Sequence, residues 1–402
     1  MKKRKNEPKA RQLKIAHIHW GFPPIIGGVE THLTIILPEM VSFGHEVSLL
    51  TAKVAGTEDQ SEYKGVKITR TPIMDLNWLK DRGFIGLEEE IHQVFSDFLD
   101  RHSPDIIHAH NMHYFSEVHI KTLAQLAEKR GCPLFLTAHN VWDDLLYLNL
   151  THNIPWTHII AVSHYIKKEM IGIGVDDTKI TVIHHGVNQE QFTPRKPPAS
   201  IFAKYPQLKK RPVVFHPARI SLVKGCDISV KAIRIVKRKY PNVLFVFAGA
   251  KNIIDWEGTQ QGDIAYLVNL IKYFDLENNV LIDIYPLDLM QDLYAATDVV
   301  IYPSSVGEPF GLIMLEAMAM AKPIIVTNVG GMPEIVHDGI NGFVVPARDF
   351  DALGYRVIQV LDDKNLRERL GRTGRQILES QYTKRKVTWQ TISLYEKFLN
   401  QK

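Results

Sequence analysis

The residues whose side chains are most suited to catalysis or ligand binding are two glutamates eight positions apart, Glu308 and Glu316. The segment that follows Glu316, residues 317–321, is almost uncharged, as in a buried helix. A carboxylate in such surroundings is usually paired or functional, because an isolated buried charge is costly. The alternative interpretation is a solvated helix face, where two glutamates at this spacing are common. The apolar context of Glu316 favours a site.

A strand, a turn and a helix must position these carboxylates. Residues 299–302 are apolar and predict a buried strand, which the Pro-Ser-Ser sequence at 303–305 cannot extend. Apolar residues then recur at helical spacing, which predicts a helix that starts between Pro309 and Gly311. Such a junction forms the crevice where doubly wound sheets bind ligands. The free amides of a helix start suit a phosphate or a developing oxyanion.

A second set of charged residues follows another predicted strand, residues 213–217. Arg219 and the pair Lys224-Gly225 lie in the turn, and a helix is expected to begin near Cys226. Arginine offers a planar fork of donors and lysine a point charge, so the two would neutralise a diphosphate. The alternative is that both are ordinary surface cations.

The first half opens with the same type of unit. A strand at 14–19, a loop with Gly27 and Gly28 followed by Glu30, a helix, and a strand at 46–50 form a β-α-β unit. Glycines let the backbone approach a ligand, although this pair lacks the spacing of a dinucleotide fingerprint. Two glycines in such a loop are otherwise only a turn.

Histidines gather near predicted strand ends in the first half: His108, His110, His113, His119 and His139. Metal binding is the alternative here, but no cysteine or acidic third ligand is evident. The sequence Asp349-Phe350-Asp351 resembles a metal-binding D-x-D, yet it opens a helix and is better explained by capping.

The central segment resembles a known family. Glu308 to Glu316, with Pro309-Phe310-Gly311 between them, is similar to the E-x7-E motif of the family-4 retaining glycosyltransferases, and the likeness continues to Pro346. The resemblance implies the GT-B fold, an α/β fold of two Rossmann-like, doubly wound parallel-sheet domains that face a central cleft. It also implies a nucleotide-sugar donor and a hydroxyl-bearing acceptor.

The resemblance assigns roles to individual residues. Arg219 and Lys224 would stabilise the departing diphosphate, Glu316 would hold the ribose hydroxyls, and His139 would hydrogen-bond the transferred sugar. The expected catalytic residues are Glu308, His139, Arg219 and Lys224; the donor-binding residues are Gly28, Arg219, Lys224, Glu308, Phe310, Gly311, Leu312 and Glu316; and the acceptor-side residues are Gly27 and Glu30. No metal or other cofactor is expected to be required.

Length and composition predict how the chain is organised. With 402 residues, two domains are favoured over one. The expected parts are a basic flexible tail (1–12), an acceptor-side domain (13–195), a nucleotide-sugar-binding domain (196–380) and a helix that packs back on the first domain (381–402). A net charge of +4 gives no field that would suit nucleic acid.

Two widely spaced cysteines and a basic N-terminus without an apolar region predict a cytoplasmic protein. Peripheral contact with the inner face of the membrane is a weaker expectation.

The function expected is transfer of a hexosyl group, with retention, from a nucleotide diphosphate sugar to a glycan, a lipid-linked saccharide or a small metabolite. Uridine is favoured because it is the commonest donor base in the family. The alternatives are a related sugar phosphorylase or nucleotide-sugar epimerase, a non-catalytic partner subunit, and a two-lobed solute-binding protein, which should carry an export signal.

Overall fold

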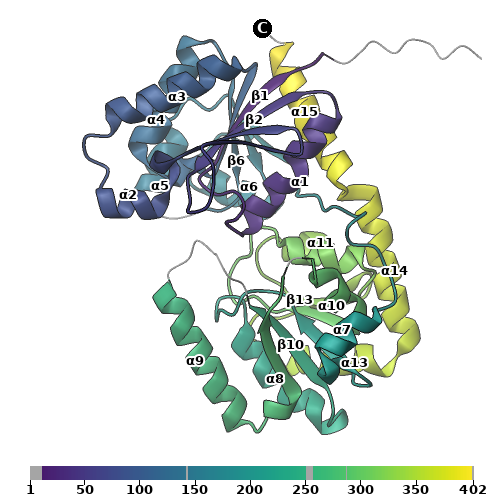
Figure 1. Cartoon of the computed structure of the whole chain (residues 1–402). Coiled ribbons are helices and arrows are strands. Elements are labelled where there is room, and N and C mark those ends of the chain that lie inside the picture. The colour runs from purple at the N-terminus through teal and green to yellow at the C-terminus, as the bar shows by residue number, and fades with distance from the viewer. Residues whose placement is uncertain (1–10, 142–143, 250–256, 287, 401–402) are drawn as a thin grey trace, which may run out of the picture.

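The computed structural model describes residues 11–141, 144–249, 257–286 and 288–400, which form two α/β domains stacked one above the other (Figure 1). Most of the predicted basic tail, residues 1–10, therefore lies outside the described residues. No helix in the described part of the chain is long and apolar enough to cross a membrane.

The first domain is built on an eight-stranded sheet in the order β3-β4-β2-β1-β5-β6-β7-β8. Its strands are β1 (Lys14–Ile18), β2 (Glu46–Ala52), β3 (Gln60–Tyr63), β4 (Val66–Thr71), β5 (Ile106–His110), β6 (Leu134–Ala138), β7 (His158–Ala161) and β8 (Ile180–Val182). Its helices are α1 (Gly28–Ser42), α2 (Leu76–Arg82), α3 (Glu88–His102), α4 (Glu117–Lys129), α5 (Leu145–His152) and α6 (His164–Gly172).

The second domain is built on a six-stranded sheet in the order β11-β10-β9-β12-β13-β14, and all of its strands are parallel. The strands are β9 (Val213–His216), β10 (Leu244–Gly249), β11 (Val280–Ile284), β12 (Val299–Tyr302), β13 (Ile324–Thr327) and β14 (Gly342–Val345). The helices are α7 (Ala199–Lys204), α8 (Cys226–Lys239), α9 (Glu257–Tyr273), α10 (Met290–Ala296), α11 (Leu312–Ala319), α12 (Met332–Ile335), α13 (Phe350–Asp362) and α14 (Lys364–Gln381). The C-terminal helix α15 (Lys384–Leu399) follows them and packs on the first domain.

Both sheets have the strand order of a doubly wound fold. With the edge strand β3 set aside, the first sheet runs 3-2-1-4-5-6-7 from β4 to β8, and the second runs 3-2-1-4-5-6 from β11 to β14. The direction of winding reverses between β1 and β5 in the first sheet and between β9 and β12 in the second. Ligands of such sheets bind outside the carboxyl ends of the strands at these reversal points. The predicted fold class is therefore confirmed, and it marks two edges for the site.

The first sheet departs from the expected parallel pattern at one edge, where β3 runs antiparallel to β4. The two strands are joined by Lys64 and Gly65, which have φ angles of 51° and 85°. Two consecutive positive φ angles are typical of a type I′ hairpin turn, which suits the twist of neighbouring strands. The sequence analysis did not predict this antiparallel edge strand, because the turn at Lys64 and Gly65 was not recognised.

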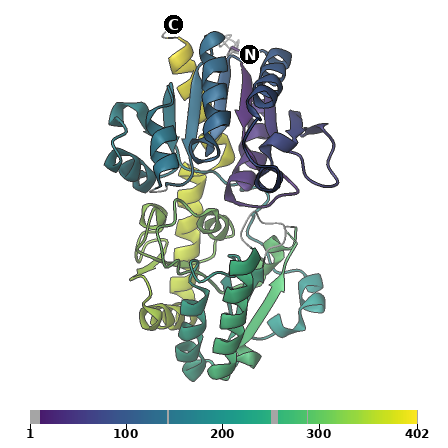
Figure 2. The same ribbon diagram turned by 90° about the vertical axis from the view of Figure 1, so that its left-hand side faces the viewer.

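Helices cover both faces of the first sheet (Figure 1). One face packs against α1 and the C-terminal helix α15, where Tyr395 lies beside Phe135 with ring centroids 5.1 Å apart. The other face packs against α3 and α4. Helix α15 thus starts beside the second domain and runs along the first, as Figure 2 shows in yellow.

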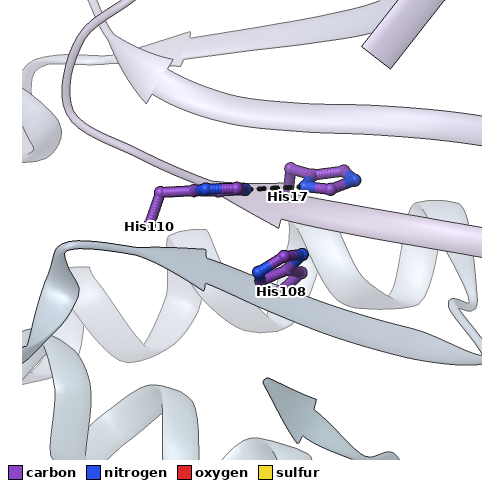
Figure 3. Close-up of side chains that lie close together, drawn as sticks. All are labelled: His17, His108 and His110. Carbon is purple, nitrogen blue, oxygen red and sulfur yellow. Dashed lines mark hydrogen bonds between the residues drawn. The ribbon is translucent and has the colours of Figure 1, made fainter. Parts of the chain in front are cut away.

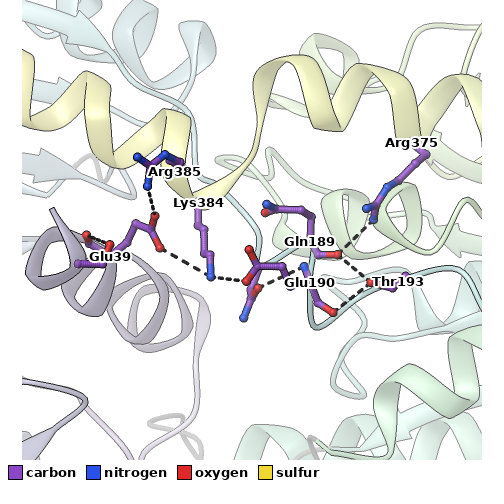
Figure 4. A network of polar contacts seen from close by, with 9 residues as sticks. Glu39, Gln189, Glu190, Thr193, Arg375, Lys384 and Arg385 are labelled. Carbon is purple, nitrogen blue, oxygen red and sulfur yellow. Dashed lines mark hydrogen bonds and ion pairs between the residues drawn. The ribbon is translucent and has the colours of Figure 1, made fainter. Parts of the chain in front are cut away.

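The two domains are joined by two chain segments that run side by side. The segment after β8 pairs with the segment between α14 and α15: the Val187 amide donates to Tyr382 O at 2.9 Å, and the Lys384 amide donates to Val187 O at 3.0 Å. Polar side chains tie this crossing to both domains (Figure 4). Lys384 pairs with Glu190 at 2.7 Å and with Glu39 of α1 at 3.7 Å.

The carboxyl edges of the two sheets face each other, and their loops touch. Phe310, after β12, packs against His185, after β8, with ring centroids 5.0 Å apart. A Cβ atom at Gly307 would lie 2.5 Å from the Tyr165 hydroxyl, and one at Gly331 would lie 3.1 Å from Ser163 Oγ. The loops after β7 and β8 of the first domain therefore pack against the loops after β12 and β13 of the second.

Candidate functional site

The charged residues of the second domain gather at its reversal point. Arg219 and Lys224 follow β9, and Glu308 follows β12, the adjacent strand at which the winding reverses. All three side chains are partly exposed. The structure thus brings together residues that are up to 89 positions apart in the sequence, from Arg219 to Glu308.

Lys224 and Glu308 are in direct contact. Lys224 Nζ lies 2.6 Å from Glu308 Oε2, and the Tyr302 hydroxyl donates to the same oxygen at 2.6 Å. Tyr302 is buried at the end of β12, and burial together with the Glu308 carboxylate raises its pKa well above the usual value. Tyr302 therefore stays protonated and fixes the carboxylate, while the ammonium group is positioned at the edge of the sheet.

The backbone around Lys224 is fixed by a glycine. Gly225 precedes α8 with φ 77°, and a Cβ atom there would lie 1.8 Å from Pro303 O. A side chain cannot fit, so the loop after β9 can approach the end of β12 only with glycine at this position. This contact holds Lys224 beside Glu308. Helix α8 begins at Cys226, as predicted.

Helix α11 begins at Leu312, one residue later than the predicted range, with Gly311 as its N-cap at φ 84°. The Phe310 side chain is buried against the first domain, so its backbone rather than its ring faces any ligand of the second domain. The amides of Phe310, Gly311 and Leu312 therefore remain the candidates for contact with phosphate.

Glu316 lies inside α11 rather than beside Glu308. The Tyr294 hydroxyl donates to its Oε2 at 2.8 Å. Burial raises the pKa of Glu316 to about 7, against the lowering effect of this hydrogen bond. Near neutral pH the carboxyl group can therefore both donate and accept a hydrogen bond, which suits a pair of hydroxyls.

On the first domain, His139 follows β6 and is buried. Its amide donates to Asn111 Oδ1 at 2.8 Å. Both ring nitrogens already have partners, because Nε2 lies 3.2 Å from His110 Nδ1 and Nδ1 lies 3.3 Å from His185 Nε2. A sugar would have to replace one of these partners to bond the ring.

His139 is one member of a chain of histidines at the carboxyl edge of the first sheet. His17 Nδ1 lies 3.0 Å from His110 Nε2, and His185 Nδ1 lies 2.9 Å from His32 Nδ1 (the first contact is drawn in Figure 3). The hydrogen-bonded order along the chain is His17, His110, His139, His185, His32.

These histidines are neutral. Burial lowers the pKa of His17 and of His32 to about 3, and it lowers the pKa of His110, His139 and His185 well below the usual value. A neutral imidazole has one donor and one acceptor nitrogen, so each ring can donate to the next along the chain. The sequence analysis listed His113 and His119 with this group, but they bond the carbonyls of Asn140 and Ile73 instead.

The ring nitrogens of His17, His108 and His110 lie within 4.8 Å of one another, which is close enough to consider a shared metal ion (Figure 3). Both nitrogens of His108 already have partners, Thr137 Oγ1 at 2.7 Å and the Tyr395 hydroxyl. The rings of His108 and His110 stack with centroids 4.3 Å apart instead of pointing at one centre. This arrangement is explained by hydrogen bonding.

In the first domain, the loop that contains Gly27 and Gly28 packs tightly against the Glu30 side chain. This side chain is buried and lies 3.2 Å from His19 Nε2, so it contacts its own domain instead of facing outward. Cβ atoms at Gly21 and Gly27 would lie 2.1 Å and 2.2 Å from its carboxylate oxygens. Gly28, in contrast, has open space at the start of α1.

One further expectation has a clear outcome, and three members of the site were missed. Asp349 caps α13, accepting from the Ala352 amide at 2.8 Å, so the capping interpretation of the D-x-D sequence is confirmed. His17, His32 and His185 were not predicted as members of the histidine chain. Side chains alternate along a strand, so the sequence places His17 on the same face of β1 as Ile15. It does not reveal that His17 lies opposite His108 of β5, because that depends on the register between the two strands.

Comparison with known proteins agrees with this geometry. Two facing domains with this strand order define the GT-B class of folds. A crystal structure of a glycosyltransferase from Rickettsia africae is similar, with a TM-score of 0.82 at 19% identity over 97% of this chain and 99% of that one. A crystal structure of Anabaena HepE in complex with UDP and glucose has a TM-score of 0.77 at 20% identity, over 96% and 100% of the two chains.

Sequence comparison gives the family. Residues 199–377 match the model for glycosyl transferases group 1, and residues 26–191 match the model for glycosyltransferase family 4. An uncharacterized glycosyltransferase of Methanocaldococcus jannaschii is 26% identical over 404 residues, which is 96% of this chain and 98% of its own length. Each half of the chain thus matches a glycosyltransferase family model, and together the two matches support a group 1 glycosyltransferase.

Proposed function

We propose that the chain is a retaining glycosyltransferase that moves a hexosyl group from a uridine diphosphate sugar to the hydroxyl group of an acceptor. The observation that carries the proposal is the placement of Arg219, Lys224 and Glu308 together at the reversal point of the second sheet. Two cations beside free helix amides are what a diphosphate leaving group requires. The UDP named in the HepE structure supports uridine as the base to test first.

In this mechanism the side chains act mainly through charge. Negative charge builds on the departing diphosphate, and preorganised cations stabilise it most strongly at that stage. Lys224 would exchange its contact with Glu308 for a phosphate oxygen, and Arg219 would hold the diphosphate from the same edge. Glu308 would be released from Lys224 but still bonded to Tyr302, and its carboxylate would contact the sugar.

We further propose that the acceptor hydroxyl attacks the same face of the sugar that the diphosphate leaves, and that its proton passes to the departing phosphate. This course gives retention without a covalent enzyme intermediate. With side chains supplying the positive charge, the reaction would proceed without a divalent metal. The acceptor would bind on the first domain beside Gly28 and Glu30, with His139 next to the transferred sugar.

The proposal is tested by supplying a panel of nucleotide sugars with and without candidate acceptors. Free nucleoside diphosphate should appear only when an acceptor is present, and NMR of the product should show the anomeric configuration of the donor. A phosphorylase would require inorganic phosphate, and an epimerase would change the sugar without releasing nucleotide. A protein that binds a donor and turns over none would be a non-catalytic subunit, and the proposal would fail.

Above pH 7, where Glu316 is mostly charged, Glu316→Gln is expected to weaken binding of UDP by about tenfold or more, because a hydrogen bond to a charged group contributes roughly 1.5–3 kcal/mol. Glutamine keeps the shape of the side chain, and Tyr294 can still donate to its amide oxygen. Isothermal titration with UDP measures the effect. Glu368→Gln, on the exposed face of α14, is the matched control and should bind UDP like the natural chain. Equal affinity in both variants would remove Glu316 from the nucleotide site.

A further inference from the structure

A carboxylate of the second domain reaches across to the first. Glu334, in α12, accepts a hydrogen bond at Oε2 from the His164 amide at 2.8 Å and one at Oε1 from the Tyr165 amide at 2.7 Å. These amides form the first turn of α6, so a side chain from one domain caps a helix of the other. The carboxylate is held in a fixed orientation at the domain boundary.

Two histidines of the first domain lie beside this carboxylate. His184 Nε2 is 3.2 Å from Glu334 Oε2, and the side chains of His184 and Glu334 are 25% and 19% exposed. The ring of His164, which is exposed, brings a third ligand atom, and all three atoms lie within 4.8 Å of one another. Two imidazoles and a carboxylate are ligands that zinc and related metals accept.

We propose that His164, His184 and Glu334 form a binding site for a divalent transition-metal ion, best fitted by Zn²⁺, that bridges the two domains. Ligand atoms at about 2.05 Å from a tetrahedral zinc ion are about 3.3 Å apart. The 3.2 Å between His184 Nε2 and Glu334 Oε2 already matches one edge of that tetrahedron. Rotation of the exposed His164 ring supplies the third ligand, and water takes the fourth position.

The hydrogen bonds of Glu334 are compatible with this role. A carboxylate has about four lone-pair positions, and the two amides use two of them, so the metal does not have to displace either amide.

The buried group of His17, His108 and His110 is less suited to a metal ion than the bridging site formed by His164, His184 and Glu334. Its rings are enclosed and His108 has no free nitrogen, whereas the bridging site is open to solvent and its members come from opposite domains. Because both histidines belong to the first domain and Glu334 to the second, a bound metal would hold the domains together. It would also keep the neighbouring loop at Gly331 against Ser163.

Titration of the full chain with zinc chloride tests the site without reference to activity. The natural chain should bind one ion at this site, and His164→Ala, His184→Ala and Glu334→Gln should each weaken its binding at least tenfold. His92→Ala, which removes an exposed histidine of α3, is the matched control and should bind zinc normally. Circular dichroism verifies that each variant is folded. Unchanged zinc affinity in both His184→Ala and Glu334→Gln would overturn the proposal.

Hydrogen exchange gives a second readout that concerns the bridge itself. Zinc should slow exchange of the His164 and Tyr165 amides in the natural chain, because a metal-held carboxylate leaves these donors less often. In His184→Ala, which keeps Glu334, zinc should have at most a small effect on the same amides. Zinc that binds tightly yet leaves these amides unchanged in the natural chain would show that the ion lies elsewhere.

Discussion

Lys224→Ala is expected to lower the rate of glycosyl transfer by about a hundredfold to a thousandfold, as removal of a preorganised electrostatic contact does in other enzymes. The lysine lies at the reversal point of the second sheet, 2.6 Å from Glu308, where the diphosphate charge would build up. Single-turnover kinetics with the donor identified from the panel measures the effect on the chemical step.

The matching control is Lys237→Ala, which removes a partly exposed cation of α8 that donates to Asp275 O at 2.6 Å, and it should leave turnover unchanged. The fold should survive in both variants, because Tyr302 still bonds Glu308 when Lys224 is absent. Transfer by Lys224→Ala at the natural rate would exclude the lysine from charge stabilisation.

Acidification is expected to unfold the first domain between pH 6.5 and 5. The pKa values of six buried histidines, His17, His32, His108, His110, His139 and His185, are lowered mainly by burial. The unfolded chain takes up protons below its ordinary histidine pKa of 6.5, while the folded chain does not, so the free energy of unfolding falls as the pH falls.

The expected loss is large. At pH 5.5, one unit below the unfolded-state pKa, each such histidine lowers the stability by on the order of 1 kcal/mol, so six together lower it by several kcal/mol, a large part of the stability of a typical domain. The loss continues downward to the folded-state pKa values, which are about 3 for His17 and His32. Urea unfolding followed by circular dichroism at a series of pH values measures this dependence.

The same experiment measures how many protons a single buried histidine takes up on unfolding. His185→Asn should reduce the number of protons taken up on unfolding by about one, because it removes one buried imidazole from the chain. His92→Gln, at an exposed position, should leave the slope of stability against pH unchanged. A stability that is flat from pH 7 to pH 5 would show that the buried histidines are not held neutral.

Apolar runs bounded by turns predicted the individual strands, whereas the GT-B arrangement of two parallel-sheet domains was implied by the resemblance to the family-4 glycosyltransferases. The hairpin of β3 was missed because it is a short, exposed strand whose only signal is the turn at Lys64-Gly65. The alternation of strands and helices could be predicted from the sequence, whereas an exposed edge strand has too little hydrophobic pattern to be recognised.

For the candidate site, the sequence placed Arg219, Lys224 and Glu308 near strand ends, and the sheet order then brought them together. The direct contacts of Lys224 and Tyr302 with Glu308 could not be predicted, since they depend on the close approach at Gly225. The histidine chain could not be predicted either, because it combines β1, α1 and the segment after β8. The bridging role of Glu334 likewise requires both domains to be in place.

The most direct test of the account is a crystal structure of the chain with uridine diphosphate. We expect the diphosphate at the carboxyl ends of β9 and β12, with its oxygens bonded to the Arg219 guanidinium and to a Lys224 ammonium that has left Glu308. A nucleotide bound elsewhere, or an unbound edge with Lys224 still paired to Glu308 at saturating nucleotide, would contradict it.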